Sequence, residues 1–86
     1  MEIINKVKEE MQKGNVIYGF RKCLKYLKLN EPKYVIIANN IPENMKKDII
    51  DAVDDKSKIV EANLSSIELG RFLGKPFSIS VIVIKK

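Results

Sequence analysis

The sequence predicts an α/β protein, a three-layer α/β/α sandwich with a mixed sheet of about four strands. Two observations support this prediction. Segments with apolar residues at helical spacing alternate with short extended runs, and two of these runs, 34–38 and the end of 78–84, are apolar almost throughout. Such strands are covered on both faces, which requires helices on each side of the sheet. The 86 residues suffice for a single core, so 1–86 is expected to form one domain.

Two helices and two strands are expected in the first half of the chain. The helix over 2–13 has an apolar face at helical spacing, formed by Ile3, Ile4, Val7 and Met11. The extended run 16–18 is followed by a second helix from residue 20, with one apolar and one basic face. Pro32 ends that helix, and the β-branched run 34–38 follows as a strand.

The second half repeats this alternation. Pro42 opens a third helix, whose inner side is formed by Met45, Ile49, Ala52 and Val53. A weaker strand is expected over 58–62. Ser65 with Glu68 has the spacing of a capping box, which predicts a short helix that ends near residue 74. The last strand is expected over 78–84, in the centre of the sheet.

The formal net charge of +5 is distributed unevenly. Residues 1–33 carry a net charge of +4, residues 34–68 carry −3, and residues 69–86 carry +4 with no acidic residue. A fold that brings the two basic ends together creates a positive face, which attracts polyanions. The alternative is that these lysines are ordinary solvated surface residues.

The composition argues against an enzyme and against a cofactor. The chain has no histidine, so no imidazole base or imidazole metal ligand is available, and Cys23 is the single cysteine. A lone cysteine fits a reducing, cytoplasmic setting. No apolar run is long enough to cross a membrane. We therefore expect no membrane association, no cofactor and no catalytic residues.

The turn at Gly19 is the first candidate for a binding site. A glycine between strand and helix lets a ligand approach the backbone, and the first amides of the helix from Phe20 favour an anion. The basic residues of this helix supply positive charge beside the turn; they are Arg21, Lys22, Lys25 and Lys28. This arrangement suits a phosphate backbone. The alternative is an amphipathic helix with a solvated lysine face.

Two further segments add base-recognition chemistry. Asn39 and Asn40 follow a strand at its carboxyl end, and an amide side chain can both donate to and accept from a base edge. Phe77 follows Lys75 in a loop, where an exposed ring offers a stacking surface for an unpaired base. The alternatives are that Asn40 caps the third helix and that Phe77 packs under its loop.

These segments, in this order, resemble the family of kink-turn-binding ribosomal proteins. The resemblance is carried by GNVIYGFR (14–21), YVIIANNIP (34–42), ELG (68–70) and GKPF (74–77), and it covers most of the chain. It is strongest to a large-subunit member of archaea and eukaryotes. The resemblance implies a three-layer α/β/α fold that recognises a sharply bent RNA, with ribosomal RNA and neighbouring ribosomal proteins as partners and no DNA.

The resemblance also implies roles for single residues. Arg21 matches a position at the start of a helix that enters the RNA groove at tandem sheared G·A pairs, and Lys25 matches a phosphate contact. Asn40 matches a base contact at those pairs, and Phe77 lies in the loop that receives an extruded base. Arg21 replaces the more usual Asn, and Lys22 stands where relatives often have Glu, so the contact is expected to be more electrostatic and less specific.

Other functions remain open on the sequence alone. The chain resembles the family closely enough to be a paralogue in another RNA–protein particle or at another ribosomal site, an interpretation that Arg21 favours. A protein-interaction module without RNA binding is the alternative from another class. Its binding face would be acidic and formed by Glu43, Asp48, Asp51, Asp54 and Asp55.

Overall fold

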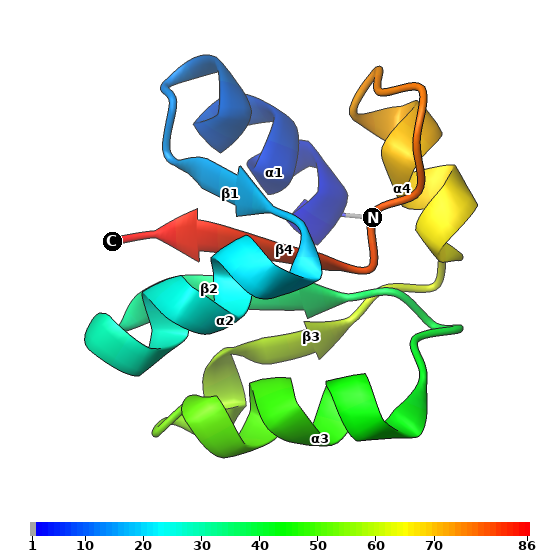
Figure 1. The fold of residues 1–86 in the computed structure, drawn as a ribbon. Coiled ribbons are helices and arrows are strands. Elements are labelled where there is room, and N and C mark those ends of the chain that lie inside the picture. Colours follow the sequence, from blue (N-terminus) through cyan, green and yellow to red (C-terminus); the bar gives the residue numbers. More distant parts are fainter. Residues whose placement is uncertain (1) are drawn as a thin grey trace.

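The computed structural model describes residues 2–86, and side chains from residue 5 onward. Helices and strands alternate along the chain (Figure 1). The helices are α1 (Glu2–Gln12), α2 (Phe20–Leu29), α3 (Glu43–Ala52) and α4 (Ser66–Phe72), with a 3-10 turn η1 (Lys56–Lys58). The strands are β1 (Val16–Tyr18), β2 (Pro32–Ile37), β3 (Ile59–Glu61) and β4 (Val81–Lys85). The side chains of Ile3 and Ile4, expected on the apolar face of α1, lie outside the described residues.

The four strands form one mixed sheet in the order β1-β4-β2-β3. β4 runs antiparallel to both β1 and β2, whereas β2 and β3 are parallel. The two central strands are those with continuous apolar runs, as the sequence predicts. Pairing of β1 with β4 places the two basic segments of the sequence side by side.

Helices cover both faces of the sheet and complete the three predicted layers (Figure 1). On one face, Val7 of α1 and Leu69 of α4 pack against Ile36 of β2. On the other face, Cys23 of α2 and Ile49 of α3 pack in a second buried cluster. Successive residues of β2 and β4 alternate between these two clusters, since side chains of a strand point to opposite faces in turn.

The last strand begins three residues later than the sequence predicts. The N–H of Ile79 donates to the carbonyl oxygen of Ser66 at the start of α4 (2.9 Å), so residue 79 is bound to the helix instead of the sheet ladder. β2, in contrast, begins earlier than expected, at Pro32, with an irregular register before Tyr34. None of the helices within residues 2–86 is long and apolar enough to span a membrane.

Glu10 links α1 to Asn15 and to Lys33 of β2. Its side chain is only 5% exposed; Oε2 accepts a hydrogen bond from Asn15 Nδ2 (3.0 Å), and Oε1 lies within 3.8–4.0 Å of the amino groups of Lys6, Lys13 and Lys33. The Asn15 hydrogen bond, followed by the three lysine charges, lowers the pKa of this carboxyl below its usual value of 4.5.

We expect Glu10→Gln to lower the thermal midpoint at pH 7. A carboxyl with a lowered pKa in the folded state stabilises the protein above its unfolded-state pKa, and that contribution is lost as the pH falls through the folded-state value. The deficit of the variant should therefore shrink under acid conditions. Thermal denaturation from pH 7 to pH 2–3 tests this, with the exposed neighbour Glu9→Gln as control; a deficit that does not change with pH would contradict it.

Candidate nucleic-acid interface

Three of the sequence segments with binding chemistry meet at one end of the sheet. The N–H of Gly19, after β1, donates to the carbonyl oxygen of Val81 (3.1 Å), and the N–H of Ala38, after β2, donates to that of Ser80 (2.9 Å). The turn at residue 19 and the loop at 39–40 thus flank the start of β4. Neighbouring strands lie about 4.8 Å apart, so the two segments are separated by roughly 10 Å.

Gly19 shapes the start of α2. Its φ of 101° and ψ of 139° lie in a region that side-chain-bearing residues rarely adopt, and no side chain caps the helix. The first helical hydrogen bond runs from the N–H of Cys23 to the carbonyl oxygen of Gly19 (3.0 Å). Arg21 and Lys22 are exposed in the first turn of α2, which contains no acidic residue, and Lys25 is exposed further along the helix. The helix start therefore presents amides and positive charge together.

Asn40 connects the loop after β2 to α4. Its Oδ1 accepts a hydrogen bond from the N–H of Ser66, the first residue of α4 (2.9 Å). The alternative that Asn40 caps the third helix is wrong, because α3 follows Pro42 and has no side-chain cap. Ser65 and Glu68 form the capping box that the sequence predicts for α4. Asn39 is exposed, and its N–H donates to the carbonyl oxygen of Leu64 (2.9 Å).

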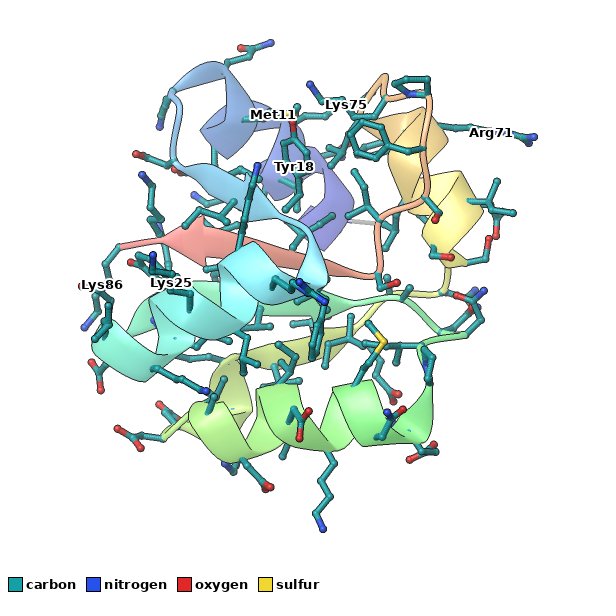
Figure 2. The ribbon with its side chains drawn as sticks, viewed as in Figure 1. Met11, Tyr18, Lys25, Arg71, Lys75 and Lys86 are labelled. Atoms are coloured by element: carbon teal, nitrogen blue, oxygen red, sulfur yellow. The ribbon has the colours of Figure 1, made fainter. Side chains whose placement is uncertain are left out.

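Phe77 is exposed and belongs to an aromatic and basic cluster. Its side chain is 51% exposed, and its ring centre lies 6.1 Å from that of Tyr18. The amino groups of Lys75 and Lys22 lie 5.2 Å and 5.8 Å from the centre of the Tyr18 ring. Figure 2 shows Tyr18 and Lys75 pointing toward one another from β1 and from the loop after α4. We call Tyr18, Lys22, Lys75 and Phe77 the aromatic–lysine cluster.

Tyr18 is not among the site residues that the sequence predicts. An aromatic residue at a strand end, directly before the glycine of a predicted anion-binding turn, was the available signal. Its partners Lys75 and Phe77 lie more than fifty residues away in sequence, so their convergence depends on the pairing of β1 with β4.

Lys28 lies apart from the other predicted site residues. It is near the end of α2, where it lines a shallow hollow together with Asp48 and Asp51 of α3. Those two residues belong to the acidic face proposed as the alternative binding surface. Lys28 thus faces negative charge, whereas Arg21 and Lys22 lie in the first turn of α2 and Lys25 lies midway along the helix.

Cys23 lies on the buried face of α2, where its thiol is shielded from solvent. Its side chain is fully buried, and burial raises the pKa of the thiol to about 12. Among the described residues, no group of three or more cysteine and carboxylate side chains is placed to hold a metal ion.

We expect the Cys23 thiol of the native protein to be unreactive toward Ellman's reagent at pH 8. Burial excludes the reagent, and the raised pKa leaves almost no thiolate at that pH. Addition of denaturant should release one reactive thiol per chain. Stoichiometric labelling without denaturant would show that α2 detaches from the sheet.

Comparison with known proteins agrees with this fold. Large ribosomal subunit protein eL30 of Methanothermobacter thermautotrophicus is 34% identical over 90 residues, spanning 99% of this chain and 88% of the relative. The solved Giardia lamblia 15.5kD RNA binding protein is 25% identical with a TM-score of 0.76, over 99% of this chain and 72% of that one. A Bacillus halodurans protein of unknown function has a TM-score of 0.79 at 19% identity, over 96% and 83%.

These similarities confirm the resemblance to ribosomal proteins that the sequence indicated. They also include a large-subunit protein, as expected. The Methanothermobacter thermautotrophicus relative is a large ribosomal subunit protein, which agrees with the prediction of a non-enzymatic protein. The model of the Ribosomal protein L7Ae/L30e/S12e/Gadd45 family matches residues 1–86, and the chain therefore belongs to this family.

Proposed function

We propose that this chain is a ribosomal RNA-binding protein that recognises and stabilises a kink-turn-like RNA in the large ribosomal subunit. The similarity to eL30 and to an RNA binding protein of the same fold supports RNA as the ligand. The observation that carries the finer proposal is the meeting of the Gly19 turn, the Asn39–Asn40 loop and the Phe77 loop at one end of the sheet.

Each part of this surface has a chemical role in the proposal. Lys22 and Lys25 hold the phosphate backbone, with the free amides at the start of α2. Arg21 and Asn40 read base edges, and Phe77 stacks on a base that is not paired. Because these contacts fit a bent RNA better than a straight duplex, binding shifts the RNA toward the bent state. The protein needs no catalytic group for this role.

A titration with a kink-turn RNA and with a plain duplex of the same length tests the proposal. We expect tighter binding of the kink-turn RNA and an affinity that falls as salt rises, since each phosphate contact releases counterions. Equal affinity for both RNAs would reject kink-turn recognition while leaving general RNA binding in place. The protein-interaction module would be favoured by two results together: neither RNA binds, and Lys25→Glu recovers the same proteins in a pull-down as the wild type does.

A second candidate is a paralogue that serves another RNA–protein particle or another ribosomal site. The observation that favours it is Arg21, which stands exposed in the first turn of α2 where the family more often has Asn. Sedimentation of tagged protein with large subunits, and not with other particles, would favour the first proposal over this one.

A further inference from the structure

Three lysines at the end of the sheet opposite the Gly19 turn share one carboxylate. The amino groups of Lys6, Lys13 and Lys33 lie 3.8 Å, 3.8 Å and 4.0 Å from Oε1 of Glu10. One carboxylate balances one of the three ammonium charges, so this group keeps an excess of positive charge. We call Lys6, Lys13 and Lys33 the lysine triad.

The lysines face the solvent, and the carboxylate lies beneath them. The side chain of Glu10 is 5% exposed, whereas those of Lys6, Lys13 and Lys33 are 37%, 64% and 43% exposed. Oε2 of Glu10 accepts a hydrogen bond from Asn15 Nδ2, which holds the carboxylate in this buried position. A partner that approaches this surface therefore meets ammonium groups first, and these attract a polyanion.

An irregularity in β2 occurs where Lys33 joins the triad. The register of β2 with β4 shifts between Pro32 and Tyr34. Tyr34 packs on the sheet face that α1 covers, and in a regular strand the residue before it points to the opposite face. Such irregularities re-aim a side chain. The amino group of Lys33 reaches Glu10 of α1, so β2 adds a third charge to the two from α1.

The triad lies too far from the Gly19 turn to be part of the same contact. The N–H of Gly19 binds the carbonyl oxygen of Val81 at the start of β4, whereas the N–H of Lys85 at its other end donates to the carbonyl oxygen of Asn15 (2.8 Å). At about 3.4 Å per residue, these two ends of β4 are roughly 14 Å apart. Lysine acts as a point charge toward phosphate, and phosphate contacts carry no sequence information.

We propose that the lysine triad docks the phosphate backbone of a second RNA segment, separate from the one at the Gly19 turn. The inference rests on the proposed function, because RNA is the polyanion that a ribosomal RNA-binding protein meets. Binding at the triad depends on salt but not on the RNA sequence. The protein thus joins two RNA segments through opposite ends of its sheet.

The test is a titration of a plain RNA duplex into the complex of the protein with kink-turn RNA. Different fluorophores on the two RNAs show whether the duplex joins the complex or displaces the first RNA. Lys33→Gln removes one charge of the triad, and Lys47→Gln on exposed α3 is the control with the same change in charge. Glu10→Gln removes the shared carboxylate, with the exposed Asp54→Asn after α3 as its matched control.

We expect Lys33→Gln to bind the duplex about threefold more weakly than the wild type does at about 50 mM salt, and to lower the salt slope by about one, as for one lost phosphate contact. Glu10→Gln should bind the duplex about twofold or more tightly, although it is less stable, because three ammonium groups then lack their carboxylate. Lys47→Gln and Asp54→Asn should bind it as the wild type does. Circular dichroism checks that every variant is folded.

The results that overturn the inference differ from those that reject the proposed function. If the duplex does not join the wild-type complex, or displaces the kink-turn RNA, there is no second site. If Lys33→Gln and Glu10→Gln both bind the duplex like the wild type, the triad serves only to link α1 to β2. If the kink-turn RNA itself does not bind, the proposed function fails, and the same variants titrated with duplex alone then decide whether the triad binds RNA.

Discussion

Replacing Gly70 by alanine is expected to destabilise the protein by ~1–3 kcal/mol, the range for inserting atoms into packed structure. The usual effect of this change in a helix is the opposite, a gain of about 0.5–1 kcal/mol. The reason is the loop after α4, which lies directly on the helix. A Cβ atom at Gly70 would stand 1.9 Å from the carbonyl oxygen of Phe77 and 3.0 Å from its carbonyl carbon.

Those two atoms belong to the backbone, so only a shift of the whole loop relieves the clash. The loop is also bound to the helix through the N–H of Lys75, which donates to the carbonyl oxygen of Gly70 (2.9 Å). Gly70→Ala should therefore displace Lys75 and Phe77 and weaken RNA binding as well. Urea denaturation and an RNA titration measure both effects, with the exposed Leu29→Ala near the end of α2 as control. Wild-type stability and affinity in the variant would contradict this account.

Asn40→Asp is expected to weaken RNA binding about tenfold or more while leaving the fold as stable as before. The aspartate keeps an oxygen that can accept from the N–H of Ser66, and a negative charge is favourable at the start of a helix. It loses the amide donor, however, and brings a negative charge toward phosphates. A lost base-edge contact alone corresponds to ~1–3 kcal/mol.

Two further variants separate the roles of this side chain. Asn40→Ala removes both the acceptor and the donor, so it should lower stability by ~0.5–2 kcal/mol, as for a lost helix cap, and also weaken binding. Asn44→Asp makes the same change in net charge in the first turn of α3, where it should leave RNA binding unchanged and should not lower stability. If Asn40→Asp binds RNA like the wild type, Asn40 serves only to join the loop to α4.

The fold could be predicted because its signals are local. The run 34–38 and the end of the last strand are apolar on both faces, and they became the two central strands. The capping box at Ser65 was likewise readable from residue types and spacing. Element ends were predicted less well where a distant group competes for the backbone, as at Ile79, whose N–H binds Ser66.

The candidate site was predicted in its parts but not in its connections. The glycine turn and its neighbouring basic residues follow from composition and position. The hydrogen bond from the N–H of Ser66 to Asn40 joins residues 26 positions apart, and no local sequence pattern predicts it. The same holds for the contacts of the Tyr18 ring with Phe77 and Lys75, which come from a loop near the other end of the sequence.

By itself, the sequence determined the class of fold, the order of its elements and the chemistry of each binding segment, because these depend on residue type and short-range spacing. Only the tertiary structure decided which of these side chains share a surface. It brought Tyr18 to Lys75 and Phe77, and it turned Lys28 toward the acidic α3. Strand order and helix packing set those contacts, and both result from pairing and burial between segments far apart in the chain.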